Sequence, residues 1–225
     1  KPQVAAPPQG LDALLRERTE LLTGYQDAAY AARYRSAVDR LREAESALSG
    51  SGLLPLTEAV ARNLAKLMAY KDEYEVARLY SDPAFLEKLR ATFDGEPGKD
   101  YRLTFHLAPP LLAPRNAQGE LTKKPFGPWM LRVFRLLARF KGLRGTPFDP
   151  FGRTAERRME RRLADDYIAL IDEFCNTLDA SNRVVALDLA RLPDQIRGFG
   201  HVKERSVVMA EQRRRELLER YRAER

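Results

Sequence analysis

The chain is most informative over residues 126–163, which read FGPWMLRVFRLLARFKGLRGTPFDPFGRTAERRMERRL. Apolar residues recur at helical spacing on both sides of a central segment, KGLRGTPFDPFG, at 141–152. Gly127 and Pro128 predict the start of the first helix, and Thr154 predicts the N-cap of the second. The central segment, called here the 141–152 loop, is rich in Gly, Pro and Phe. Such a composition is typical of a rigid, shaped contact surface.

The same stretch is strongly basic. Residues 132–162 contain ten Lys and Arg against three acids, an excess of seven positive charges, and the whole chain has a net charge of +7. Positive and negative charges in the rest of the chain therefore balance. This one basic region needs a functional explanation. The cations are Arg132, Arg135, Arg139, Lys141, Arg144, Arg153, Arg157, Arg158, Arg161 and Arg162, and the acids are Asp149, Glu156 and Glu160.

Composition predicts a folded, soluble protein. The chain has 225 residues, of which 44% are hydrophobic and 32% charged, enough for one large domain or two small ones. No apolar run approaches the roughly 20 residues that span a bilayer. The only cysteine, Cys175, lies on an apolar helical stripe with Ile171 and Leu178, which predicts an inert buried thiol and excludes an internal disulfide. This pattern fits a reducing cytoplasm.

Residues 1–10, KPQVAAPPQG, combine Pro, Ala and Gly without periodicity, as an interdomain linker does. They contain no apolar core of a signal peptide. We therefore expect a neighbouring domain on the N-terminal side and a single, mostly helical domain over residues 11–225.

The hydrophobic pattern predicts a mainly α fold. An apolar stripe at helical spacing over 11–48 ends at SGSG, residues 49–52. Alternating residues from Tyr101 to Leu107 predict a strand, and a return through Leu121 to Phe126 predicts a small β-hairpin or extended arm near 101–126. Further helices are expected over 57–70, 71–80, 83–93, 128–140, 154–178, 181–192 and from 203 to the C-terminus.

Catalytic motifs are nearly absent. His106 and His201 have no second histidine three or four residues away, which argues against a zinc site. The sequence GFG at 198–200 follows a helical stretch instead of a strand and lacks a third glycine, so it does not predict a dinucleotide site. No P-loop or nucleophile-elbow motif occurs. His201 follows this Gly-Phe-Gly turn and is a candidate anion contact.

Two side-chain clusters have both a structural and a functional interpretation. The acids Asp165, Asp166, Asp172 and Glu173 on the helix over 154–178 are expected to be solvated or paired with arginines, because no matching Glu-x-x-His exists for a carboxylate cage. Aromatic residues beside the arginines could stack nucleic-acid bases, although at helical spacing they are more often core. These aromatics are Phe126, Trp129, Phe134, Phe140, Phe148 and Phe151.

Several strings of the chain together resemble one enzyme family. They are TGYQDAAYAARYR, LMAYKDEYEVARLY, TFHLAPPLLA, FGPWM with FRLLARFKGLRGTPFDPFGRTAERRMER, and IRGFGHVKE. These strings resemble the C-terminal domain of the large fused indolepyruvate ferredoxin oxidoreductases, members of the 2-oxoacid ferredoxin oxidoreductase family. The resemblance extends from about Arg18 to Lys203.

The resemblance implies a parent enzyme that oxidatively decarboxylates arylpyruvates or similar 2-oxo acids to acyl-CoA. Such an enzyme uses thiamine diphosphate, Mg²⁺, CoA and iron–sulfur clusters and passes electrons to ferredoxin. An iron–sulfur cluster needs several cysteines, and the chain has one. The GDG motif for thiamine diphosphate is also missing. We therefore expect no catalytic residue, metal or cofactor on these residues, and no activity from them alone.

The predicted role is assembly and docking. The surfaces around residues 143–152 and 196–201 are expected to pack on the catalytic domains of the same chain or on a second protomer, and the basic face to steer CoA or an acidic ferredoxin. The rival hypothesis is a helical nucleic-acid-binding module. The candidate anion-binding residues are Arg144, Arg153, Arg157, Arg158, Lys203 and His201.

Overall fold

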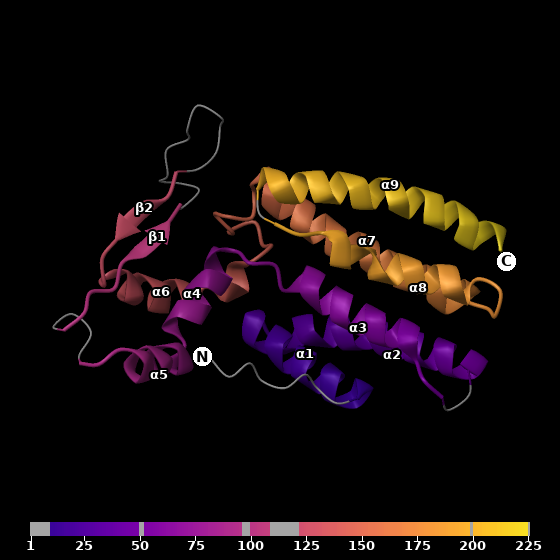
Figure 1. Cartoon of the computed structure of the whole chain (residues 1–225), viewed down its shortest axis with the longest axis horizontal. Helices are drawn as coiled ribbons and strands as arrows, with labels where there is room; N and C mark the ends of the chain where they lie inside the picture. The colour runs from indigo at the N-terminus through magenta and orange to yellow at the C-terminus, as the bar shows by residue number, and fades with distance from the viewer. Residues whose placement is uncertain (1–9, 50–51, 96–99, 109–121, 199, 225) are drawn as a thin grey trace. The chain divides into compact units, whose positions relative to one another are not determined.

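The computed structural model describes residues 10–49, 52–95, 100–108, 122–198 and 200–224 (Figure 1). The fold is mainly helical with a small two-stranded antiparallel sheet, which confirms the predicted fold class. Its contacts define two compact units: unit 1 comprises Lys1–Ala69 and Met159–Arg225, and unit 2 comprises Tyr70–Arg158. The linker predicted at 1–10 lies outside the described residues except for Gly10, and the single domain over 11–225 stays a prediction.

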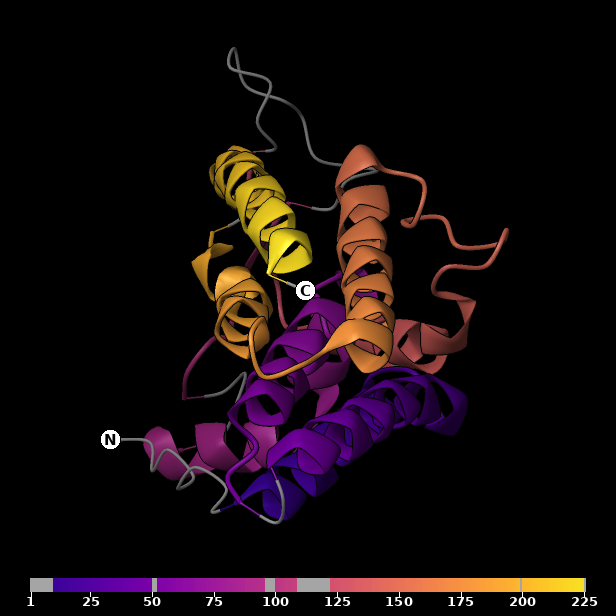
Figure 2. The same ribbon diagram turned by 90° about the vertical axis from the view of Figure 1, so that its right-hand side faces the viewer.

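Unit 1 is a bundle of helices. Helices α1 and α2 lie side by side, as do α8 and α9 (Figures 1 and 2). None of the helices in the described ranges is long and apolar enough to cross a membrane. The elements of the unit are α1 (Leu11–Tyr25), α2 (Ala28–Ser49), α3 (Pro55–Met68), α7 (Ala155–Thr177, of which the first turn belongs to unit 2), α8 (Arg183–Arg191), the 3-10 helix η2 (Leu192–Gln195) and α9 (His201–Ala223).

The apolar stripe over 11–48 forms two helices instead of one. Helix α1 ends at Tyr25, and α2 begins at Ala28. The break occurs because the carboxylate of Asp27 accepts a hydrogen bond of 2.8 Å from the backbone N–H of Tyr30, as a helix-capping residue does. The hydrophobic period passes through this break almost unchanged, so periodicity alone could not find it.

The core of unit 1 also contains buried hydroxyl groups, each with a partner. Tyr34 donates its hydroxyl hydrogen to the carbonyl oxygen of Ala61 at 3.1 Å, and Tyr167 donates to that of Ala190 at 2.7 Å. Burial raises the pKa of both phenols, so both remain protonated donors. These bonds connect α2 to α3 and α7 to α8 through the apolar interior.

A buried carboxylate caps α3. Glu45 on α2 is fully buried and accepts hydrogen bonds from the backbone N–H groups of Leu56 and Thr57, at 3.0 and 2.7 Å. The hydroxyl of Thr57 donates to the same carboxylate at 2.7 Å. Leu54, the residue before α3, offers no side-chain cap. Glu45 therefore supplies from another helix the acceptor that the first turn of α3 needs.

Unit 2 contains α4 (Glu73–Ser81), α5 (Pro83–Thr92), β1 (Phe105–Leu107), β2 (Lys124–Phe126), α6 (Met130–Arg139) and the 3-10 helix η1 (Lys141–Leu143). The two strands pair antiparallel, with Phe105 opposite Phe126 and His106 opposite Pro125. This pairing confirms the predicted hairpin in the 101–126 region. The strands are short because Pro125 has no N–H to donate across the ladder. His106 is exposed on β1.

The apolar core of unit 2 is small and aromatic. Tyr80 of α4 stacks on Phe134 of α6 with ring centroids 5.2 Å apart. Phe105 of β1 meets both rings edge to face at 5.3 Å. Ala77 completes the buried set. Edge-to-face and stacked rings add about 0.5–1.5 kcal/mol per pair to the burial of their area. This cluster joins α4, α6 and the hairpin.

We predict that Glu45→Ala lowers the free energy of unfolding by about 2–3 kcal/mol, because three donors lose a buried charged acceptor. Urea unfolding followed by circular dichroism measures the change. Glu43→Ala, at an exposed position of the same helix, is the matched control and should cost about 0.5 kcal/mol or less. Equal stabilities for the two variants would contradict the capping role of Glu45.

Candidate docking site

The 141–152 loop folds around the carboxylate of Asp149. This side chain is only 3% exposed. It accepts hydrogen bonds from the backbone N–H groups of Gly145 at 2.8 Å and Phe151 at 3.1 Å, and from the Tyr74 hydroxyl at 3.2 Å. Gly145 has φ of 74°, a conformation that glycine adopts without strain. The loop is therefore closed by one buried acceptor with three donors.

A buried ion pair holds the start of the same loop to α4. Arg144 is 5% exposed and donates two hydrogen bonds to Asp72, Nε to Oδ2 at 2.5 Å and Nη2 to Oδ1 at 2.9 Å. Asp72 is also the N-cap of α4 and accepts from the backbone N–H of Glu75 at 2.8 Å. The pair is bidentate, which is the strong geometry for arginine and carboxylate.

Aromatic rings line this network. The Arg144 guanidinium lies 5.5 Å from the centroid of the Tyr74 ring, and Phe151 meets that ring edge to face at 5.4 Å. Burial first, and then the charges of Asp149 and Asp72, raise the pKa of the Tyr74 phenol. Tyr74 thus stays protonated and donates to Asp149 over the whole physiological pH range.

The locked loop presents a phenylalanine to solvent. Phe148 is 81% exposed, and Pro147 and Pro150 beside it are exposed as well. Arg153, the residue that follows the loop, donates a hydrogen bond from Nη2 to the carbonyl oxygen of Pro147 at 2.8 Å. This bond connects the tip of the loop to its C-terminal end. The expectation that aromatics in this region are mostly core is wrong for Phe148, Trp129 and Phe140. An exposed aromatic ring on a rigid loop is suited to inserting into a partner surface.

The predicted anion-binding residues of unit 2 fall into two kinds. Arg144 is committed to Asp72, and Arg157 pairs with Glu73 at 3.3 Å. Burial disfavours the charge of Arg157, but the attraction of the Glu73 carboxylate and the hydrogen bond that Arg157 donates to it outweigh this effect and raise the pKa of Arg157. Arg153 and Arg158 are exposed. Of these four arginines, only the exposed Arg153 and Arg158 offer a charge to an external anion.

Lys203 and His201 lie on α9 in unit 1. The ammonium group of Lys203 donates to both carboxylate oxygens of the buried Glu160, at 2.6 and 2.7 Å. It is thus neutralised locally. His201 is the first residue of α9, and its side chain lies outside the described part of the structure.

Three further arginines are exposed on α6, Arg132, Arg135 and Arg139. They belong to the basic stretch but were not among the candidate contacts. Within the described residues, none of the three makes an ion pair or a side-chain hydrogen bond. The sequence signal that could have found them is the absence of any acid between residues 128 and 148. Within the basic stretch of unit 2, the exposed arginines without a carboxylate partner in the described chain are therefore those of α6 together with Arg153 and Arg158.

The acids of α7 are paired with arginines, as predicted. Asp165 contacts Arg33 at 2.8 Å, and Glu173 contacts Arg222 at 2.8 Å. Asp172 likewise contacts Arg40 at 2.6 Å. In the described ranges no three His, Cys, Asp or Glu side chains gather as metal ligands would.

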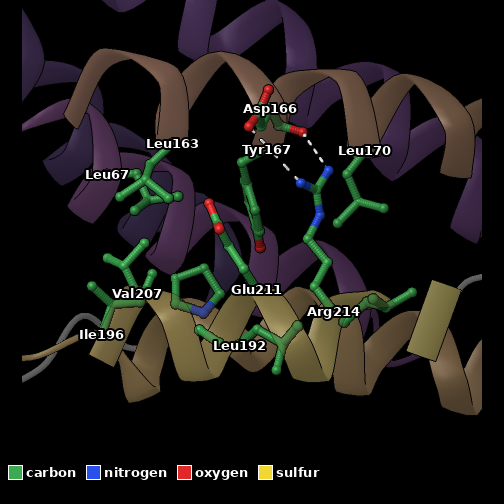
Figure 3. Close-up of a pocket in the computed structure, with 13 residues that line it drawn as sticks. Leu67, Leu163, Asp166, Tyr167, Leu170, Leu192, Ile196, Val207, Glu211 and Arg214 are labelled. Atoms are coloured by element: carbon green, nitrogen blue, oxygen red, sulfur yellow. Dashed lines mark hydrogen bonds and ion pairs between the residues drawn. The ribbon is translucent and has the colours of Figure 1, made fainter. Parts of the chain in front are cut away.

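Unit 1 has a small cavity between α7, the α8–η2 segment and α9. Its volume is about 50 Å³, and apolar side chains such as Leu163, Leu170 and Val207 line it (Figure 3). Arg214 reaches across its edge to Asp166 at 3.9 Å. A water molecule occupies about 30 Å³ of liquid and ligand pockets span about 300–1,000 Å³, so this is a packing gap too small for a cofactor.

We predict that Arg144→Ala lowers the free energy of unfolding by about 3–5 kcal/mol, because it leaves Asp72 buried without its partner. Circular dichroism during urea unfolding measures the loss. The control is Arg158→Ala, which removes an exposed arginine from the same basic stretch and should change stability by about 0.5 kcal/mol or less. A similar small effect from both variants would mean that the Arg144–Asp72 pair does not hold the loop.

A second prediction concerns Cys175, which is partly buried and packs against the core of unit 1. Burial raises the pKa of its thiol, and the nearby Arg40 only partly offsets this. The thiolate is the reactive form, so alkylation by iodoacetamide at pH 8 should be slower in the native chain than after denaturation in urea. Mass spectrometry of the timed reaction measures both rates. Faster alkylation in the native chain would identify Cys175 as an activated nucleophile.

A model of a known protein family matches residues of both units. No curated protein and no solved structure matches the chain. Residues 11–216 match the model of a family of unknown function, DUF6537. The matched range begins with α1, includes the whole 141–152 loop and ends within α9. Because this range covers most of its length, the chain belongs to the DUF6537 family.

Proposed function

We propose that the chain is a non-catalytic docking module of an indolepyruvate-type 2-oxoacid ferredoxin oxidoreductase in the cytoplasm. The resemblance of the strings quoted above, which extends from about Arg18 to Lys203, supports this assignment. In this proposal, catalysis and the thiamine diphosphate, Mg²⁺ and iron–sulfur cofactors belong to the other domains of the enzyme. The module contributes to assembly with the catalytic domains or with a second protomer.

The observation that carries the docking role is the locked loop with Phe148 at its tip. Ordering a flexible loop on binding costs conformational entropy, and a loop already fixed by Asp149 and Arg144 avoids that cost. Its aromatic ring is mostly in water, although burying it would be favourable by about 1.5–3 kcal/mol. Aromatic side chains are enriched at protein–protein interfaces.

The proposal also includes electrostatic steering of CoA or ferredoxin. Arg144, Arg157 and Lys203 are held by carboxylates and contribute little free charge. The steering face therefore consists of the exposed arginines of the basic stretch in unit 2, namely Arg153 and Arg158 with those of α6. A fixed cationic face raises the association rate of anionic partners and loses this effect as salt increases.

We predict that Phe148→Asp in the full-length enzyme disperses the assembly and lowers turnover of indolepyruvate with CoA and ferredoxin. A charged side chain at the centre of an interface leaves an unpaired, desolvated carboxylate. Light scattering measures assembly, and ferredoxin reduction measures turnover. The control is Leu53→Asp, because Leu53 is 91% exposed and belongs to unit 1. It should leave both quantities unchanged.

The two parts of the proposal fail in different ways. If the wild-type full-length chain does not reduce ferredoxin with any 2-oxo acid, the assignment to this enzyme class is wrong. If it does, but Phe148→Asp assembles and turns over like the wild type, the locked loop is not the docking surface.

A further inference from the structure

Helix α6 has an apolar strip that faces solvent, and it is separate from the 141–152 loop. Its residues are spaced four, three and four apart along the chain. This strip, called here the α6 strip, remains exposed although the opposite side of the helix is in the core of unit 2. The members are Trp129 at 57% exposure, Val133 at 38%, Leu136 at 57% and Phe140 at 47%.

The sequence predicted one apolar side of this helix, and the structure divides it into two. Phe134 is 3% exposed and packs with Met130 and Leu137 in the core of unit 2. Positions 133, 136 and 140 lie about 100°, 160° and 120° around the helix from Phe134, at 100° per residue. A helix that needs only one buried face has no folding reason for a second apolar strip. Exposed apolar patches of this kind mark interaction sites.

The spacing of the strip indicates a helical partner. A four–three–four pattern is the a and d seam along which two helices pack side chains into one another. In that register Val133 and Phe140 take a positions, and Trp129 and Leu136 take d positions. The strip extends over 12 residues, about 16 Å or three turns of helix. That length suits one short helix better than a broad, flat surface.

The charges beside the strip indicate that this partner helix is acidic. In the same register Arg132 and Arg139 occupy successive g positions, where side chains form salt bridges with the facing helix. Arg135 lies farther round the same side. Helix α6 contains no acid, and in the described part of the chain these three guanidinium groups have no carboxylate partner. Acidic side chains on the molecule that covers the strip would pair with them.

The same charges disfavour two other occupants. A second copy of α6 would bring arginines and no acid to the interface, so like charges would face one another. A membrane-surface helix has cations on both flanks of a wide apolar face, whereas the α6 strip is narrow and has arginines along one edge only. Its other edge is continuous with the core of unit 2.

We infer that the α6 strip is a docking surface for one amphipathic helix of a partner protein, with apolar residues in a heptad seam and Asp or Glu along one edge. The apolar seam provides affinity, and Arg132 and Arg139 fix the register and orientation. This inference goes beyond the proposed function. It shares the arginines of α6 with the proposed steering face but does not involve the 141–152 loop, so the test at Phe148 and the test at α6 can fail independently.

Trp129 makes the test direct, because it is the only tryptophan in the chain and belongs to the strip. The probe is a synthetic helical peptide without aromatic residues, with Leu at a and d positions and Glu at e and g positions. We expect it to shift Trp129 emission to shorter wavelength in a saturable way that weakens with salt. Leu136→Ser should weaken binding about tenfold or more, through lost apolar contact.

A charge swap provides the specific readout. The double variant Arg132→Glu/Arg139→Glu should lose about tenfold or more in affinity for the Glu peptide and gain affinity for the same peptide with Lys at e and g. The matched control is Arg205→Glu/Arg215→Glu, which reverses two exposed arginines on α9 in unit 1 and should bind like the wild type. Because all four positions are exposed, circular dichroism should show no change of fold.

Three results would overturn the inference. One is the absence of any Trp129 shift with the Glu peptide. Another is equal binding of the Glu and Lys peptides to the wild-type chain. The third is tighter binding of Trp129 to phosphatidylglycerol vesicles or to a 20-base single-stranded oligonucleotide than to the Glu peptide, with loss of that binding on charge reversal. This would assign the strip to a lipid surface or to nucleic acid.

Discussion

Two carboxylates and one guanidinium are buried together in unit 2, and the form of the 141–152 loop depends on them. Asp72 neutralises Arg144, while Asp149 is satisfied by two backbone N–H groups and the Tyr74 hydroxyl. The apolar core of this unit is small, so its packing alone would leave a loop with three glycines and two prolines free to move. Fully partnered buried charges instead specify one conformation for it.

This network also divides the basic stretch of the sequence into two populations of cations. Arg144 and Arg157 are internal counter-ions of α4 and its N-cap, since their charges are matched by Asp72 and Glu73. The arginines of α6 are external, because no carboxylate of the described chain approaches them. Three exposed arginines without a carboxylate partner in the described chain therefore lie on a helix that also exposes apolar side chains. Charge and apolar surface together favour a protein partner over a simple anion.

The sequence predicted most of the secondary structure. It could not predict the contacts between residues that lie far apart in the chain. Asp82 and Thr154 cap α5 and α7 through their side chains, as their positions before Pro83 and Ala155 indicate. The pairing of Arg144 with Asp72 joins residues 72 positions apart, and no local pattern contains that information. The exposure of Trp129 and Phe140 was missed for a similar reason. Helical period shows which residues share a face, but only the packing of α4 and the hairpin decides which of two apolar faces is inward.

The most direct measurement is amide hydrogen exchange at Gly145 and Phe151. Both lie in a surface loop, where amides ordinarily exchange almost as fast as in an unfolded chain. If Asp149 locks the loop, these two amides should exchange about tenfold or more slowly than in the unfolded chain, together with the amides of α4. Exchange at the unfolded rate, with α4 still protected, would show that the loop is mobile and is not a preformed docking surface.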